Sequence, residues 1–487
     1  MHSLLRLTTL LTIVTAGCGA GAEEPNKADT PAAAQATTDT GPTTSLVSNK
    51  AADVPDLRTR KTGSDWPGFL GPTGDSKSTE RGILKEWPAE GPPLVWEEEV
   101  GTSYGMPTIS RGRLFMFDRH GDQARLTCMK SETGEELWKF EYPLEYEDVY
   151  GYNNGPRCCP VVDGDRLYIY GVAGMLHCLK VTDGEVLWKL NTMTKFGVVP
   201  NFFGIASAPV VEDDLLIVAV GGSPAESQGL PVGQLDQVQP NGTGIVAFNK
   251  FTGEVEYTVG DELASYASPV LATIDGRRWG FAFMRGGLIG FDPKSGKQDF
   301  HFPWRARLLE SVNASNPVVV GSEVFISETY GPGSAMLKVA PGKADVAWQD
   351  ELRSRDRAME MHWNTPVYVD GYLYGSSGRH SGSAELRCVE WKTGKVMWKE
   401  RRLGRASLLA VDGHLVCLTE DGLLRLLRTN PEKFDVVATT ALSSETIGDR
   451  PRPKLKYPAW AAPILSHGLL YVRGAEKIVC LELIPKQ

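Results

Sequence analysis

The pattern of apolar and polar positions repeats along most of the chain. Three segments align residue by residue: 126–138, 176–188 and 386–398. Each has an alternating apolar stretch, a Gly-containing turn and a second stretch that ends in Trp. Weaker copies end at Tyr257, Phe300, Trp348 and near Val436. Each copy predicts two strands joined by a tight turn, because the turn needs a positive φ that glycine adopts without steric cost.

A second mark precedes each copy, a Pro followed by β-branched or apolar residues. It occurs at Pro107, Pro160, Pro209, Pro269, Pro317, Pro366 and Pro463, with Ser407–Leu409 as a copy without proline. Between the two marks lies a hairpin with an Asp-Gly turn, as in Val162–Tyr168. Each unit therefore holds four short strands. Eight such units fill residues 63–487 and predict an all-β fold, an eight-bladed β-propeller of four-stranded antiparallel blades.

The last unit, from Tyr457 to Leu483, supplies only three strands. The segment Pro93–Trp96 ends in Trp like the other outer strands but has no unit of its own. We expect it to complete the last blade as an N-terminal outer strand. This pairing would close the ring between the two ends of the chain and remove an open sheet edge.

The N-terminus has the pattern of an export signal. Residues 1–17 contain Arg6 and then an apolar stretch too short to cross a bilayer. Small residues precede Cys18, so we expect cleavage before Cys18 and lipidation of its thiol; the alternative is an ordinary secretory peptide and a soluble secreted protein. Residues 18–62 contain no aromatic side chain and predict a disordered tether. The expected location is the periplasm or cell envelope, with a lipid anchor in the membrane.

The overall charge limits the class of partner. The chain has 51 Lys and Arg against 60 Asp and Glu, a net charge of −9, and no basic block of the kind that phosphate backbones require. Nucleic acid is therefore excluded as a partner. The eight His show no metal-ligand spacing. We expect a monomer.

The cysteines fall into two groups. Cys128, Cys178, Cys388 and Cys480 occupy one repeat position, which other units fill with Ala247 or Gly290. A slot that accepts Cys, Ala or Gly is a small buried slot, and free Cys packs there as a small apolar side chain. Cys158 and Cys159 lie outside this position, and in an exported protein the two could oxidise to each other.

The hairpins at Thr133–Trp138, Asp183–Trp188 and Thr393–Trp398 resemble the tryptophan-docking repeat of pyrroloquinoline quinone (PQQ) propellers. That family includes quinoprotein alcohol dehydrogenases and the BamB-type lipoprotein scaffolds of outer-membrane assembly. The segment Asp65–Gly74 is similar to the start of exported bacterial PQQ-like repeat proteins. In the dehydrogenases a pair of adjacent cysteines packs against the quinone, so the resemblance makes Cys158 and Cys159 candidates for cofactor binding.

The sequence also departs from the dehydrogenases. Their docking motif opens Ala-x-Asp, whereas Cys128–Lys130, Cys178–Lys180 and Cys388–Glu390 stand here, and only Gly290–Asp292 keeps the Asp. No segment matches their calcium ligands, so no metal residue and no catalytic residue is assigned. These departures favour a non-enzymatic binding or scaffold protein without a cofactor. The alternative is a PQQ- and Ca²⁺-dependent alcohol or sugar dehydrogenase.

The irregular segments indicate where a site would lie. The long crossovers and the insertion Gly221–Gly242 open on one face of a propeller, and the tight turns open on the other. Residues just before each inner strand would line the mouth of the first face: Tyr104, Arg157, Cys158, Phe203, Tyr266, Asn313, His362, Trp363, Arg405, Tyr457 and Trp460. They predict a surface for a protein partner or a small ligand, with carbohydrate as a further alternative. The same side chains could instead plug the central channel.

Overall fold

The computed structural model describes residues 53–352, 354–448 and 450–486. The predicted export signal, Cys18 and the tether up to residue 52 lie outside the described residues. The chain divides into two units, residues 1–47 and 48–487. The fold below belongs to the second unit. Among the described residues, no helix has the length and apolar character needed to cross a membrane.

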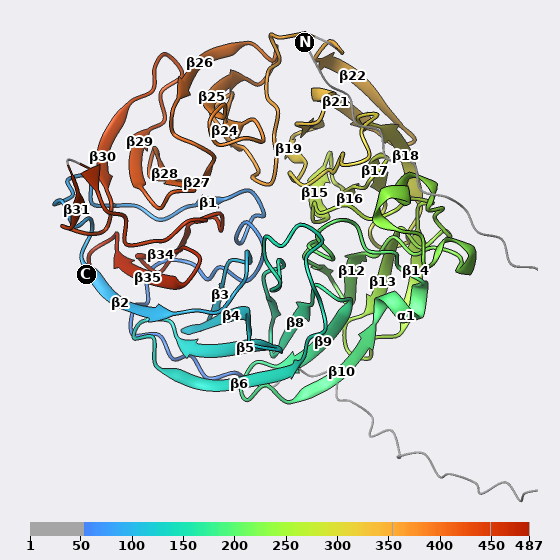
Figure 1. Ribbon diagram of the computed structural model, residues 1–487, viewed down its shortest axis with the longest axis horizontal. Helices are drawn as coiled ribbons and strands as arrows, with labels where there is room; N and C mark the ends of the chain where they lie inside the picture. The colour runs from blue at the N-terminus through green and yellow to red at the C-terminus, as the bar shows by residue number, and fades with distance from the viewer. Residues whose placement is uncertain (1–52, 353, 449, 487) are drawn as a thin grey trace, which may run out of the picture. The chain divides into compact units, whose positions relative to one another are not determined.

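Eight blades, each of four antiparallel strands, form a ring, which confirms the predicted eight-bladed β-propeller (Figure 1); one blade gains a short fifth strand from the N-terminal side of the chain. Blades 1 and 2 consist of β3 (Thr108–Ser110), β4 (Arg113–His120), β5 (Gln123–Lys130), β6 (Glu136–Pro143), and β7 (Val161–Asp163), β8 (Arg166–Tyr170), β9 (Met175–Lys180), β10 (Val186–Asn191). Blades 3 and 4 consist of β11 (Val210–Glu212), β12 (Leu215–Ala219), β13 (Ile245–Asn249), β14 (Val255–Val259), and β15 (Val270–Ile274), β16 (Arg277–Phe283), β17 (Gly287–Phe291), β18 (Gln298–Pro303). Blades 5 and 6 consist of β19 (Val318–Val320), β20 (Glu323–Glu328), β21 (Gly333–Ala340), β22 (Lys343–Gln349), and β23 (Val367–Val369), β24 (Tyr372–Ser377), β25 (Glu385–Glu390), β26 (Val396–Arg401). Blades 7 and 8 consist of β27 (Ala406–Val411), β28 (His414–Thr419), β29 (Leu424–Arg428), β30 (Val436–Thr440), and β33 (Ile464–Ser466), β34 (Leu469–Arg473), β35 (Lys477–Glu482), β2 (Leu94–Glu99).

The ring closes as predicted, through an N-terminal strand. β2 pairs antiparallel with β35, with Trp96 opposite Cys480. Blade 8 therefore joins both ends of the propeller chain. Each proline of the repeat stands directly before an inner strand, where its missing N–H costs no ladder hydrogen bond, as Pro160 does before β7.

The tryptophans of the outer strands hold neighbouring blades together. Their indole N–H groups donate to backbone carbonyls of the next blade: Trp96 to Ser131 (2.9 Å), Trp138 to Val181 (3.2 Å), Trp188 to Lys250 (3.0 Å), Trp348 to Trp391 (3.0 Å) and Trp398 to Asn430 (2.8 Å). Gly184 is needed for two reasons, since it has φ +76° and a Cβ there would lie 2.7 Å from the Trp138 ring. The repeat cysteines lie across the strand from these rings and are fully buried, which confirms the small slot.

A capping segment, residues 53–93, crosses the tight-turn face of the ring. It contacts the inner strands of four blades: Trp66 with Ile109 of β3 (2.9 and 2.8 Å), Pro67 with Val162 of β7 (2.8 Å), Ser64 with Ser466 of β33 (2.8 Å), and β1 (Lys77–Ser78) in parallel with β27. Trp66 is completely buried. The sequence did not predict this cover.

The capping segment also corrects the extent of the tether, which we had predicted to run to residue 62. Val54 is only 2 % exposed and packs among the side chains of blades 1 and 2. Arg58 pairs with Asp65 at 3.2 Å, and Arg60 forms an ion pair with Glu482 of β35. Residues 53–62 contain no aromatic side chain, but the buried Val54 and the ion pair between Arg60 and Glu482 attach them to the ring.

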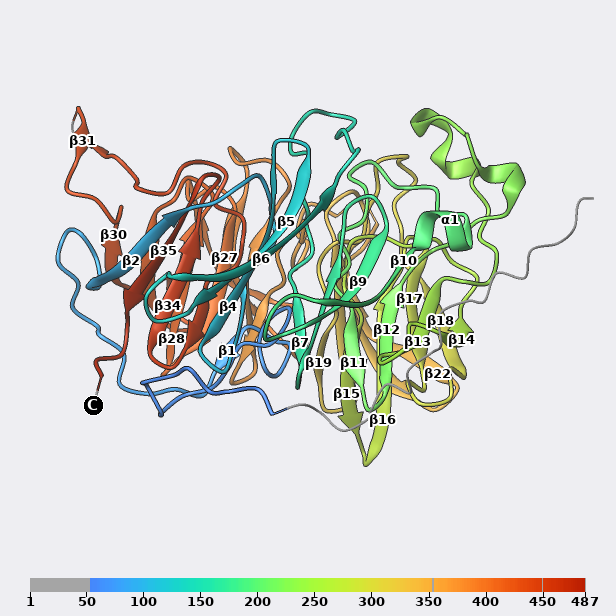
Figure 2. The same ribbon diagram turned by 90° about the horizontal axis from the view of Figure 1, so that it is seen from below.

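The long crossovers gather on the opposite face, as predicted (Figure 2). Within the crossover after β10 lies α1 (Thr192–Phe196), which Asn191 caps by accepting hydrogen bonds from two backbone N–H groups. The insertion between β12 and β13 carries the 3₁₀ helices η1 (Ala225–Ser227) and η2 (Val232–Gln237), and the crossover after β30 carries the short pair β31 (Thr446–Ile447) and β32 (Arg450–Pro451). We call this the long-loop face.

Candidate functional site

Side chains from successive blades touch one another around the mouth of the long-loop face. Each follows a crossover and precedes an inner strand, so the ring itself brings them together. We call this set the collar: Tyr104, Arg157, Phe203, Tyr266, His362, Trp363, Arg405, Tyr457 and Trp460. It contains most of the residues that the sequence predicted for the mouth.

Arg157 connects the collar residues that come from blades 1 to 4. Its guanidinium lies over the ring of Tyr104 (5.1 Å) and over the ring of Phe203 (5.7 Å). Its Nε donates to the carbonyl of Phe203 at 2.7 Å, and Asp148 accepts from its Nη2. Phe203 contacts Tyr266 with ring centroids 5.7 Å apart. The arginine is therefore fixed by an acid and a carbonyl between two aromatic faces, a favourable cation–π arrangement.

Trp460 is the centre of the other side. Its ring lies 4.6 Å from Tyr104 and 5.5 Å from Trp363, and Tyr457 meets it edge-on at 6.2 Å. The guanidinium of Arg405 covers the same indole at 4.8 Å. Because Tyr104 contacts both Arg157 and Trp460, one chain of contacts joins blades 1, 2, 3, 4, 6, 7 and 8.

A buried ion pair fixes Arg405. Glu420, at the end of β28, accepts from Arg405 Nε (2.9 Å), Arg405 Nη2 (2.7 Å) and Trp460 Nε1 (3.1 Å). Burial alone raises the pKa of the Glu420 carboxyl, but the hydrogen bonds from Arg405, with that from Trp460, outweigh it and lower the pKa. The carboxylate thus stays charged and holds two members of the collar in place.

His362 stays neutral beside this pair. Burial first, and then the positive charge of Arg405, lower the pKa of His362 to about 3. Its Nδ1 lies 3.4 Å from Arg405 Nη1 and its Nε2 lies 3.3 Å from the hydroxyl of Tyr330. A neutral imidazole avoids placing a second cation against the arginine.

Asn313 does not belong to the surface, which corrects our prediction for this residue. It is 1 % exposed, and its Nδ2 donates to the carbonyls of Met284 (2.7 Å) and Trp304 (3.1 Å). Its own carbonyl accepts from the backbone N–H of Tyr266 at 3.0 Å. Its amide therefore satisfies the backbone of a crossover instead of facing the mouth.

The sequence predicted Phe203 but missed the aromatic patch that this residue forms with side chains of two crossovers. Tyr150 is 47 % exposed and Tyr152 is 66 % exposed. Tyr150 stacks on Tyr152 (5.8 Å) and on Phe202 (5.9 Å), and Tyr152 contacts Phe203 at 6.2 Å. We define the aromatic patch as Tyr150, Tyr152, Phe202 and Phe203. A Tyr-x-Tyr motif in a crossover without strand periodicity was the signal for it.

The insertion between β12 and β13 supports this patch from behind. Phe202 is 2 % exposed and packs in one cluster with Leu235 of η2, Val238 and Val312. Asp236 of η2 pairs with Arg285 (3.1 Å) and Arg305 (2.5 Å), which ties the insertion to blade 4. The patch is therefore a supported surface.

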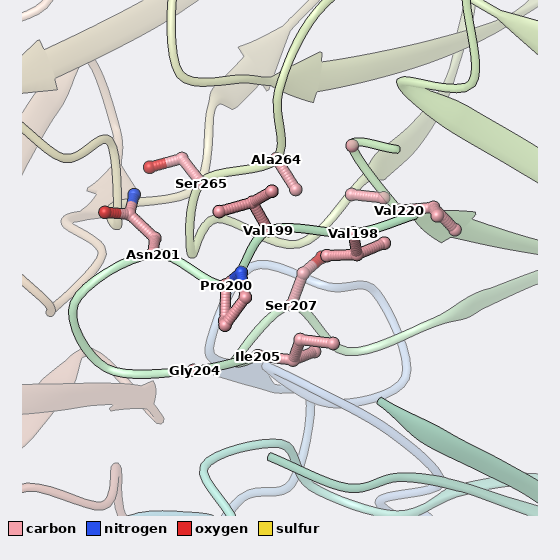
Figure 3. A pocket seen from close by; sticks show the side chains of 12 residues that line it. Val198, Val199, Pro200, Asn201, Gly204, Ile205, Ser207, Val220, Ala264 and Ser265 are labelled. Carbon is pink, nitrogen blue, oxygen red and sulfur yellow. The ribbon is translucent and has the colours of Figure 1, made fainter. Parts of the chain in front are cut away.

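Cys158 and Cys159 are both free thiols within the core, 2 % and 1 % exposed. Cys158 Sγ donates to the carbonyl of Ser207 at 3.3 Å, and burial raises the pKa of the Cys159 thiol to about 12. Ser207 also lines a cavity of about 20 Å³ among Val198, Ile205 and Val220 (Figure 3), enough for about one water molecule. In this structure the pair offers no face to a flat cofactor, so these residues do not fit a quinone. Among the described residues, no group of three His, Cys, Asp or Glu lies close enough to hold a metal ion.

The chain resembles known proteins in sequence. It is 26 % identical over 174 residues to an outer membrane protein assembly factor BamB of Shewanella oneidensis, covering 32 % of this chain and 41 % of that protein. Thus the aligned region spans less than half of that relative's length. It is 19 % identical over 369 residues to the protein of the same name from Moranella endobia, covering 72 % of this chain and 71 % of that protein.

A solved structure has the same fold. The quinohemoprotein alcohol dehydrogenase of Comamonas testosteroni superposes with a TM-score of 0.57 at 12 % identity, covering 87 % of this chain and 81 % of that one. At this identity the likeness concerns the fold alone. A family model described as outer membrane protein assembly factor BamB matches residues 148–400, which is more than half of the chain. Together with the ring of docked blades, this match shows that the chain belongs to the family of BamB-like β-propellers.

Proposed function

We propose that this protein is a non-enzymatic scaffold of the cell envelope that acts in outer-membrane protein assembly and binds a partner protein at its long-loop face. The observation that carries the proposal is the aromatic patch, two stacked and exposed tyrosines beside a collar of fixed aromatic and arginine side chains. The names of the two sequence relatives support the process.

The composition of this surface suits a protein partner. Tyr, Trp and Arg are the residues that most often carry binding energy in protein interfaces. Here the hydrogen bonds of Arg157 and of Glu420 hold the collar before any partner arrives. Side chains that are already ordered lose little conformational entropy on binding, which favours affinity.

The protein would work as a monomer attached to a membrane. Lipidation of Cys18 would supply the anchor, and the aromatic-free segment after it would let the propeller reach a partner in the periplasm. Replacing Cys18 by Ser should move the protein from the membrane to the soluble periplasmic fraction. If the variant stayed in the membrane fraction, the proposed lipid anchor would be contradicted. The proposal of a partner site at the long-loop face would not be affected.

The partner site can be tested in cells that lack the chromosomal gene. The variant Tyr150→Ala/Tyr152→Ala should lower the yield of folded outer-membrane proteins, measured by heat-modifiable migration on gels. The matched control is Val255→Ala/Val436→Ala, which removes exposed apolar side chains from the outer strands β14 and β30. Wild-type assembly with the tyrosine variant, at equal protein levels, would contradict the proposal.

We also propose that the protein works without a quinone, because the two cysteines are buried in the core. Purified protein should keep an unchanged absorbance spectrum when PQQ and Ca²⁺ are added and then removed by gel filtration. It should not catalyse dye-coupled oxidation of alcohols or sugars. Stoichiometric uptake of PQQ with turnover would overturn this proposal.

A further inference from the structure

A basic groove lies on the outer wall of the propeller, away from the collar. It runs between the crossover that contains residues 355–357 and the outer strand β26, and its volume is about 400 Å³. Of the ten residues that line it, five are basic and one is acidic: Arg355, Arg357, Arg387, Lys395 and Lys399 against Asp356. The whole chain has a net charge of −9, so this groove is positively charged in a protein that is negatively charged overall.

Only part of this charge is neutralised internally. Arg357 pairs with Glu360 at 2.5 Å, and Arg387 pairs with Glu385 at 2.6 Å. Arg355, Lys395 and Lys399 form no ion pair within the described part of the chain, and all three are exposed. The buried Nε of Arg357 also has no hydrogen-bond partner among the described residues. The groove therefore keeps donors and positive charge that an acidic ligand would satisfy.

The groove follows the free edge of a sheet. β26 is the last strand of blade 6 and pairs on one side only, with β25 (Figure 1). A sheet edge presents backbone N–H and C=O groups that can pair with an added strand. Lys395 and Lys399 are four residues apart, which corresponds to about 13 Å of extended chain. Val396, Met397 and Trp398 between them supply apolar surface.

We propose that this groove binds an extended acidic peptide segment of a partner protein, which adds along β26 and places its carboxylates against Arg355, Lys395 and Lys399. A peptide is the occupant that uses the edge, the apolar floor and the spaced cations together. A flat anionic membrane would need the cations on a protruding surface, whereas here they line a recess between a loop and a strand. This site is separate from the collar, so the inference does not depend on the function proposed above.

Binding can be measured with a fluorescein-labelled ten-residue peptide of alternating Glu and Val, by fluorescence anisotropy with the full-length protein. The groove variant is Arg355→Glu/Lys399→Glu. The matched control is Lys139→Glu/Lys189→Glu, because these exposed lysines follow the docking Trp in blades 1 and 2 as Lys399 does in blade 6, and the change in net charge is the same. Equal thermal unfolding curves would establish that the variants fold alike.

We expect the groove variant to bind the peptide at least about tenfold more weakly and the control to stay within about twofold, because only the groove variant places repulsive charges beside the ligand. A Gln/Val peptide of the same length should not bind the wild type or either variant. Equal weakening by both variants would show attraction without a site and would overturn the inference. The inference would also be overturned if the wild-type protein did not bind the Glu/Val peptide. It would be overturned as well if the groove bound vesicles that contain anionic lipid and did not bind the peptide.

Discussion

The two faces of this propeller are built from the same repeat but differ in what covers them. On the tight-turn face, Trp66 of the capping segment is completely buried, and Glu80 accepts from the backbone N–H groups of His467 (3.0 Å) and Gly468 (2.7 Å). On the long-loop face, Tyr152 and Tyr457 are 66 % and 58 % exposed. One face is closed by the chain itself, and the other presents aromatic surface to solvent.

The difference shows how the fold separates stability from binding. The turns of this face are short and leave little room for variation, so the tight-turn face serves mainly as a surface for packing. The crossovers can change in length and composition without disturbing the strands, and function gathers on such loops above a rigid scaffold. Substitutions on the capped face should therefore change folding, and substitutions of exposed side chains on the long-loop face should change binding.

The largest effect on stability should come from Trp66→Ala. Its ring is packed in the apolar core together with side chains of the inner strands, and removal of a buried Trp costs about 3–5 kcal/mol of the free energy of unfolding. Urea denaturation followed by circular dichroism would measure the loss. Tyr152→Ala, on the exposed face, should change the free energy of unfolding by less than about 0.5 kcal/mol. Similar losses for both variants would remove the distinction between the faces.

A smaller effect, on the open face, should follow from Glu420→Ala. The change leaves the buried Arg405 without its acid, which costs about 3 kcal/mol. Because hydrogen bonds hold the pKa of Glu420 below its ordinary 4.5, this stability is present above that value and is lost as the pH falls through the folded-state pKa. Asp345→Ala removes an exposed ion pair with Lys343 and should cost less than about 0.5 kcal/mol. Equal unfolding midpoints for the two variants would contradict a fixed collar.

The sequence was sufficient for the ring because the constraints on a blade are local. The docking Trp, the turn glycine and the small slot that Cys128 fills all belong to one hairpin and recur at one spacing, so each copy supports the others. The closing strand at Trp96 followed from counting strands. Within the site, the residues before each inner strand could be placed at the mouth because the blade order fixes their position.

The rest depended on contacts that no repeat encodes. The capping segment touches four blades through single residues such as Trp66 and Arg60, and nothing near them in the sequence shows their partners. Asn313 was predicted for the surface, but the carbonyls of a crossover take up its amide. Tyr150 and Tyr152 form one patch with Phe202 and Phe203, some 50 residues later, and the sequence around the tyrosines does not show these contacts.

Two glycines of the tight-turn face give a finer comparison. Gly276, in the first hairpin of blade 4, has φ +78° and open space around it, whereas Gly184 has φ +76° and the Trp138 ring against it. Alanine should cost about 1 kcal/mol at Gly276, from the left-handed backbone alone, and about 2 kcal/mol at Gly184, where the docking ring must also shift. Chemical denaturation of both variants would measure this difference. Equal losses would mean that the docked Trp138 contributes nothing at this turn.

The smallest effect concerns His362 of the collar and depends on pH. The pKa of His362 is lowered to about 3, so the folded protein stays neutral there while the unfolded chain takes up a proton below about 6.5. Stability therefore falls as the pH drops, by about 1 kcal/mol between pH 6.5 and 5.5 for this group. His177, with a pKa of about 4, acts in the same direction, and Glu328, whose pKa burial raises to about 7, acts in the opposite one.

The comparison must therefore be between wild type and His362→Gln at each pH, where the shared groups cancel. We expect the free energy of unfolding of wild type to fall more steeply than that of the variant as the pH is lowered. If the free energies of unfolding of the two proteins changed with pH in parallel, water would have access to the imidazole of His362, and the collar would not enclose this side chain.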